Sequence, residues 1–381
     1  YYLRCAAPLI VLFAFMVAPV GGATGTTAIV DIPDTNLRVV LEIALDKPDG
    51  AAITAADMAT LTNLSAKGAK IRDLTGLECG VNLTVLSFRN HHISDLSPLA
   101  GLTQLQTLDL GGNPLAELSP LAGLTKLEFL DIPNCGISDL APLAGLTHLI
   151  HLNLHKNEIA DLSPLGGLEN LEDLELSVNR VSDLTPLGRL TNLERLWLSD
   201  NHVTDLSPLK GLTNLEILWL ENNHVSDLAP LSNLPELIQV WLTSNQISDL
   251  APLAQLTQLE DLQIAQNRVS DLTPLAKLTN LKSLSLALNR IEHLSPLKGL
   301  TNLKQLHLHG NRVSDLSPLA GLKNLKRLGL GENRVRDLSP LIELTRLKKL
   351  DVRENTLNPE TVITQIPLLE ALGVNVKYSR P

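Results

Sequence analysis

A leucine pattern with a period of 22 residues runs through most of the chain and constrains its fold more than any other feature. Residues 215–236, LEILWLENNHVSDLAPLSNLPE, show the unit, whose general form is LxxLxLxxNxVxDLxPLxxLxx. A repeat this short cannot bury its apolar side alone, so it must stack on its neighbours. Aromatic residues make up only 3% of the chain, which leaves leucine to build the core. The pattern therefore predicts one long stack of repeats.

The first leucine of the unit can be followed along the whole stack. A weaker copy begins at Leu61. The regular copies begin at residues 83, 105, 127, 149, 171, 193, 215, 237, 259, 281, 303, 325, 347 and 369.

Each part of the unit predicts a local structure. In LxxLxL the last two leucines lie two residues apart, so on a strand both point inward and the residue between them points outward. Parallel stacking of these strands gives a continuous sheet. The asparagine that follows can donate to and accept from backbone groups that the turn leaves unpaired. The aspartate and proline of DLxPL favour the cap and first turn of a short helix on the opposite, convex side.

The two ends of the stack need caps. At the N-terminal end we expect helices within residues 32–60, with Asp34 as an N-cap and Leu37, Val40, Leu41 and Ala44 as one apolar stripe. Thr54 and Asp57 resemble a capping box.

At the C-terminal end Asn358-Pro359 predicts a helix start, and Leu369, Leu372 and Val374 predict a last strand in register. We divide the chain into an N-terminal cap with a degenerate first repeat (24–82), repeats (83–358) and a C-terminal cap (359–381).

Residues 1–23 have the pattern of a secretory signal peptide. Arg4 precedes an apolar run at residues 8–20, which is followed by the small residues Gly21, Gly22 and Ala23. Thirteen apolar residues are too few to span a bilayer, which needs about 20. We therefore expect a secreted or cell-surface protein with no transmembrane segment. Two cysteines follow this signal, Cys79 and Cys135, and their different positions within the repeat predict free, buried thiols.

The repeat and the N-terminal segments IPDTNLRVVLEIALD, ITAADMATLTNL and IRDLTGLE resemble the internalin-type family of bacterial leucine-rich-repeat proteins. The resemblance covers residues 32–376. It implies an α/β solenoid, a curved right-handed horseshoe with a parallel sheet on its concave side and short 3-10 helices or turns on its convex side. It also implies export from a bacterial cell and recognition of a partner in the concave face.

All three tryptophans of the chain occupy the same outward position of three consecutive strands. Neighbouring strands lie about 4.8 Å apart, so we expect the indoles of Trp197, Trp219 and Trp241 to form one exposed ladder. Clustered exposed aromatics are typical of binding sites, although duplication of the repeat also explains two of the three. Flanking residues complete the predicted partner-binding set: Asp173, Glu175, Arg195, Glu221, Gln239 and Gln263.

The ladder leaves two kinds of partner open. A protein ligand is favoured by the family resemblance and by the charge distribution, with 9 Lys/Arg against 24 Asp/Glu in residues 83–280 and 14 against 7 in residues 281–358. A glycan is favoured by the flat indole faces, which suit sugar rings. The net charge of −10 argues against a nucleic-acid partner. We expect a monomer.

The motifs of the usual enzyme and metal sites are missing from the sequence. It contains no nucleophile elbow, phosphate-binding glycine loop or zinc signature, and its recurring carboxylates belong to the structural columns of the repeat. His307 and His309 share one strand face without a third ligand, which indicates surface histidines. We predict a binding protein with no catalytic residues, no metal site and no cofactor.

Overall fold

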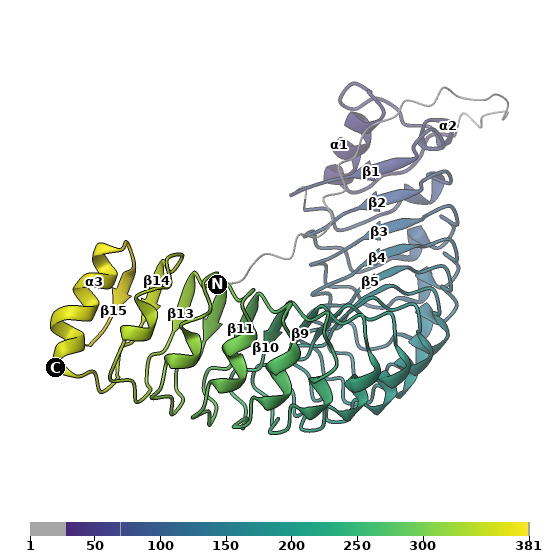
Figure 1. Cartoon of the computed structure of the whole chain (residues 1–381). Helices are drawn as coiled ribbons and strands as arrows, with labels where there is room; N and C mark the ends of the chain where they lie inside the picture. The colour runs from purple at the N-terminus through teal and green to yellow at the C-terminus, as the bar shows by residue number, and fades with distance from the viewer. Residues whose placement is uncertain (1–27, 69, 380–381) are drawn as a thin grey trace.

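A computed structural model describes residues 28–68 and 70–379, which form one curved right-handed solenoid (Figure 1). Within these residues fifteen parallel strands pair in sequence order into one open sheet on the concave side. Short 3-10 helices follow the strands on the convex side (Figure 1). The predicted fold class is confirmed. The predicted signal peptide, residues 1–23, lies outside the described residues.

The strands are three residues long and repeat in register. From β1 to β14 each residue pairs with the residue 22 positions further on, as Trp197 does with Trp219. From β1 to β14 the middle residue of each strand is buried and its two neighbours point outward, as the alternation predicts, whereas Val376 in the middle of β15 is half-buried. The strands are β1 Asn63–Ser65, β2 Val85–Ser87, β3 Thr107–Asp109, β4 Phe129–Asp131, β5 His151–Asn153, β6 Asp173–Glu175, β7 Arg195–Trp197, β8 Ile217–Trp219, β9 Gln239–Trp241, β10 Asp261–Gln263, β11 Ser283–Ser285, β12 Gln305–His307, β13 Arg327–Gly329, β14 Lys349–Asp351 and β15 Asn375–Lys377.

The convex 3-10 helices begin near the aspartate of the DLxPL segment. That aspartate lies one residue before the formal N-cap, which is a leucine, so the predicted cap position is wrong by one residue. The carboxylate still performs a capping role, because Asp227 Oδ1 accepts a 2.8 Å hydrogen bond from the N–H of Ala229. The 3-10 helices are η1 Leu77–Cys79, η2 Ser97–Leu99, η3 Ser119–Leu121, η4 Ala141–Leu143, η5 Ser163–Gly167, η6 Thr185–Arg189, η7 Ser207–Gly211, η8 Ala229–Asn233, η9 Ala251–Leu253, η10 Thr273–Lys277, η11 Ser295–Gly299, η12 Ser317–Leu319 and η13 Ser339–Leu341.

A ladder of asparagines joins consecutive repeats inside the coil. Asn245 Nδ2 donates to the carbonyls of Leu220 (2.8 Å) and Leu242 (3.1 Å), and its Oδ1 accepts from the N–H of Val225 (2.9 Å). Each asparagine thus bonds to its own repeat and to the one before it, as the sequence predicts. Cys135 occupies one rung, where its Sγ donates to the Leu110 carbonyl at 3.4 Å.

The N-terminal cap contains α1 Thr35–Ala44 and α2 Ala55–Met58. Asp34 caps α1, and Thr54 with Asp57 forms a reciprocal capping box at α2, as predicted. The predicted apolar stripe of α1 is only partly right. Leu37 and Leu41 are buried and Val40 is half-buried, but Ala44 is exposed.

The C-terminal cap departs from the 22-residue period. A π-helical turn, η14 Thr361–Gln365, leads into α3 Ile366–Ala371, so Leu369 is buried in a helix rather than in the predicted strand. Leu372 is exposed at the end of α3. The last strand, β15, pairs Asn375 with Lys349, a separation of 26 residues. Both Cys79 and Cys135 are free, but only Cys135 is fully buried.

Candidate binding site

The sheet register brings the three tryptophans side by side on the concave face. Trp197 pairs with Trp219 and Trp219 with Trp241 across β7, β8 and β9. The rings of Trp219 and Trp241 stack at 3.9 Å with an interplanar angle of 3°, whereas Trp197 meets Trp219 edge-on at 6.1 Å and 84°. The three indoles lie side by side, as the sequence predicts, but all three side chains are half-buried and so less exposed than expected. The cluster is a stacked pair with a third ring set across its end.

The indole N–H groups of this cluster are buried without a hydrogen-bond partner among the described residues. Burial of an unpaired N–H costs about 1–3 kcal/mol. Asp261 lies near Trp241: burial raises the pKa of its carboxyl and the indole opposes this rise, but the two groups do not reach hydrogen-bond geometry. The cluster therefore holds unused donors at the centre of the concave face.

Three half-buried carboxylates surround the tryptophans. Glu175 is the register neighbour of Trp197, Glu221 follows Trp219 by two residues, and Asp261 lies on β10 beside β9. Burial raises the pKa of all three carboxyls, and Asp200 raises that of Glu221 further. None of the three pairs with a lysine or arginine within the described ranges. Three carboxylates thus lie beside the aromatic rings, and only Glu175 has a histidine, His155, within ion-pair distance, at 3.9 Å, among the described residues.

Two of the predicted partner-binding residues are used internally. Arg195 forms a bidentate ion pair with Asp173, in which the Arg195 Nη2 atom lies 2.9 Å from the Asp173 Oδ2 atom. His151 Nδ1 approaches the same Asp173 carboxylate at 3.4 Å, and its Nε2 lies 3.8 Å from Asp131 Oδ1. Burial opposes a charge on His151, but these two carboxylates outweigh burial and raise its pKa to about 9. Asp173 and Arg195 therefore belong to a row of alternating charges that neutralise one another.

The two predicted glutamines differ in their contacts. Gln263 donates to Asp261 and, at 3.0 Å, to Ser283 Oγ, which fixes its side chain beside the cluster. Gln239 is half-buried on β9, in register with Asp261. Sequence reasoning missed Asp261 itself, although an acidic residue at an outward strand position next to the third tryptophan was the available signal.

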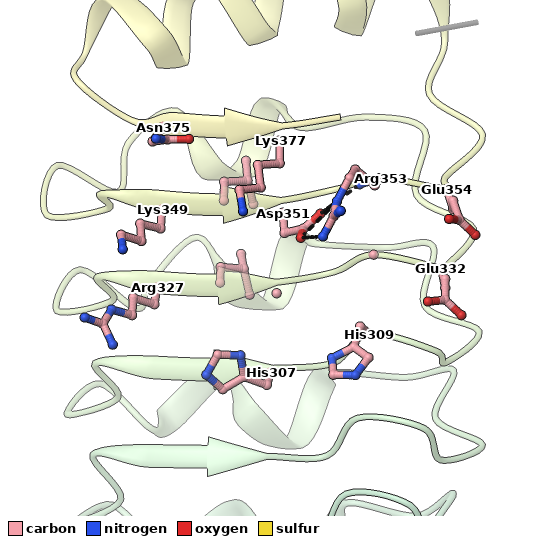
Figure 2. Close-up of a pocket in the computed structure, with 14 residues that line it drawn as sticks. His307, His309, Arg327, Glu332, Lys349, Asp351, Arg353, Glu354, Asn375 and Lys377 are labelled. Carbon is pink, nitrogen blue, oxygen red and sulfur yellow. Dashed lines mark hydrogen bonds and ion pairs between the residues drawn. The ribbon is translucent and has the colours of Figure 1, made fainter. Parts of the chain in front are cut away.

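A second concave site lies between β12 and β15 (Figure 2). It is a hollow of about 590 Å³, and His307 and His309 line one side of it. Sequence reasoning treated these two as surface histidines. It missed the hollow, whose signal was glycine at the outward positions 329 and 331. In the described residues no group of three or more His, Cys, Asp or Glu side chains is arranged to hold a metal ion.

We compared the chain with protein-family models, curated proteins and solved structures. A family model described as leucine-rich repeats (2 copies) matches residues 81–123, 103–145, 125–167, 147–189, 191–233, 235–277 and 279–321. No curated protein matches the chain.

Similar solved structures include an internalin (inlF) from Listeria monocytogenes, at 35% identity and a TM-score of 0.82 over 83% of this chain and 94% of that one. The functional domain of InlJ from Listeria monocytogenes is similar at 23% identity and a TM-score of 0.78, over 90% of this chain and 80% of that one. A plant peptide hormone receptor, RGFR1 in complex with RGF2, shares the fold at 21% identity and a TM-score of 0.57, over 80% of this chain and 61% of that one. None of the helices within the described residues is long and apolar enough to cross a membrane.

Proposed function

The chain belongs to the internalin-type leucine-rich-repeat proteins, and from this premise we propose that it binds a protein partner through the tryptophan cluster of its concave face. The observation that carries the proposal is the set of three adjacent half-buried indoles whose N–H groups have no hydrogen-bond partner in the part of the chain that the structure describes. Aromatic anchors of this kind dominate the binding energy of protein interfaces. These N–H groups are buried, so a partner acceptor reaches them when the indole rings reorient, and the new hydrogen bond relieves the desolvation cost that the free protein carries.

The charges around the cluster indicate the chemistry of the partner. Glu175, Glu221 and Asp261 are desolvated, and among the described residues none of them makes an ion pair with a lysine or an arginine. A lysine or arginine of the partner would supply the missing positive charge, and it would also contact an indole as a cation–π pair. The proposed ligand is therefore a basic protein segment laid across β6 to β10.

A protein ligand is better supported than a glycan. Sugar rings bind to the open faces of aromatic side chains, but Trp219 and Trp241 each cover one face of the other at 3.9 Å. Trp197 stands against Trp219 edge-on. The cluster thus presents the edges of its indole rings and the neighbouring carboxylates more than flat ring faces. Binding is also the proposed activity in place of catalysis.

The proposed setting is outside the cell, supported by the predicted signal peptide of residues 1–23 and by the family. Expression of the full gene followed by separation of cells and medium tests this proposal. Recovery of the protein only from the cell interior would contradict it.

The test of the proposed function is the affinity of Trp219→Ala for a partner isolated by the wild-type protein. Loss of the central indole should weaken binding by about 2 kcal/mol, roughly 30-fold. Phe129→Ala is the matched control, since Phe129 is a half-buried outward aromatic on β4, away from the cluster. Unchanged affinity of Trp219→Ala in surface plasmon resonance would refute the proposal. Saturable binding of a defined glycan that is lost in Trp219→Ala would replace the protein ligand with a carbohydrate.

A further inference from the structure

The hollow between β12 and β15 is formed by missing side chains. Gly329 occupies on β13 the outward position that holds tryptophan on β7, β8 and β9. A Cβ atom at Gly329 would lie 3.2 Å from His307 Nδ1, so the glycine lets the imidazole lean over the strand. Gly331 extends the same floor by two residues. The result is a cavity of about 590 Å³; the other strands from β1 to β14 carry a side chain at the position of Gly329, while the position of Gly331 is glycine also at Gly111.

The charges of the hollow are divided between its two edges (Figure 2). Arg327 and Lys349 begin β13 and β14 on one edge, and among the described residues neither has a carboxylate within ion-pair distance. Arg327 Nη1 donates a hydrogen bond to the Gln305 amide oxygen at 3.3 Å. Glu332 and Glu354 lie on the opposite edge (Figure 2).

An ion pair separates these two edges. Arg353 Nε lies 2.9 Å from Asp351 Oδ1, so these two charges neutralise each other. Lys377 also lies beside Asp351 and lowers the pKa of its carboxyl, after Arg353. The uncompensated positive charge of Arg327 and Lys349 therefore lies along the edge of the hollow where β13 and β14 begin (Figure 2).

We propose that this hollow binds a single carboxylate of a partner, an aspartate or glutamate side chain held between Arg327 and Lys349 while the partner's backbone crosses Gly329 (Figure 2). Four Arg/Lys and three Asp/Glu side chains line the hollow, a net charge of +1. That net charge matches one carboxylate, while Glu332 and Glu354 repel a polyanion. Charge-assisted hydrogen bonds from Arg and Lys are the usual means of holding a carboxylate. The site lies outside the tryptophan cluster and does not depend on it.

The test uses the full chain and a small probe, N-acetyl-glutamate N-methylamide, followed by the NMR signal of the His307 ring. The glutamate probe should shift this signal saturably, and the uncharged glutamine analogue should leave it in place. Inorganic phosphate forms a separate arm of the titration. Saturation by phosphate with no response to the glutamate probe would overturn the assignment of the ligand as a carboxylate.

Variants test whether the contact is specific. Lys349→Gln should weaken probe binding by about fivefold or more, the effect of one charge-assisted hydrogen bond. Lys326→Gln removes an equal charge from a residue outside the hollow and should leave binding within about twofold of wild type. Gly329→Leu should abolish binding by filling the cavity. Equal binding of the glutamine analogue, or unchanged binding by a folded Lys349→Gln, would refute the proposal.

Discussion

The asparagine ladder yields a stability prediction whose size follows from its hydrogen bonds. In Asn245→Ala the carbonyl of Leu220 keeps a second donor, Asn223 Nδ2 at 3.1 Å, and the carbonyl of Leu242 keeps Asn267 Nδ2 at 2.9 Å. The N–H of Val225 donates to Asn245 Oδ1 at 2.9 Å and has no second acceptor among the described residues. One N–H inside the coil therefore becomes unpaired.

The loss of this acceptor determines how far the free energy of unfolding falls. An unsatisfied buried N–H costs about 1–3 kcal/mol, and the doubled carbonyl contacts limit any further loss. The free energy of unfolding of Asn245→Ala should fall by this amount. Asn245→Cys should fall by a similar amount, because the thiol at the equivalent rung, Cys135, donates to a carbonyl and accepts no backbone N–H within the described residues.

Urea unfolding followed by tryptophan fluorescence is the measurement. All three tryptophans lie on β7 to β9, next to the mutated rung, so fluorescence reports on this region. Far-UV circular dichroism followed in parallel tests whether the stack unfolds as one unit, which repeat proteins do not always do. A midpoint and slope equal to those of wild type would show that Val225 finds another acceptor and that the reasoning is wrong.

Three further predictions concern strain, protonation and long-range charge. Val178 is a β-branched residue held at φ 60°, a backbone conformation that asparagine adopts more easily. Val178→Asn should therefore raise the free energy of unfolding by about 1 kcal/mol in urea titrations. A decrease in the free energy of unfolding would show that Val178 is not strained. The His151 pKa of about 9 exceeds the unfolded value near 6.5, so its contribution to stability is full below about pH 6.5 and is lost as pH rises through 9. Compared with wild type, His151→Gln should remove this decline, on the order of 1–2 kcal/mol, in thermal melts at several pH values. Partner association should slow with added salt, and charge reversal to Glu at three outward lysines should flatten that dependence in surface plasmon resonance: Lys304, Lys326 and Lys348.

The local elements of this protein could be predicted from the sequence alone. The spacing of two residues between leucines determines which side of a strand faces the core, and the 22-residue period determines the register between strands. The column of Trp197, Trp219 and Trp241 follows from these two periods without knowledge of any contact. The role of Asn245 follows in the same way, since every turn of the coil leaves the same backbone groups to be satisfied.

The cap at the C-terminal end could not be predicted by extending the period. Counting 22 residues from Leu347 reaches Leu369, but that leucine lies in α3, and β15 begins only at Asn375. The last repeat has one neighbour instead of two, so a helix covers the core that the next repeat would otherwise cover. Periodicity describes repeats that are alike and carries no information about where they stop.

The chemistry of the concave face was decided by the tertiary structure. Sequence spacing places Asp173, Arg195 and Glu221 on the same face, but the structure pairs the first two and leaves Glu221 without a cation. It also turns Trp197 across the stacked pair of Trp219 and Trp241. Such choices depend on side-chain rotamers and on charges contributed by neighbouring strands 22 residues away. The period places these side chains on one surface, and only packing in three dimensions determines which of them satisfy one another and which remain free to bind.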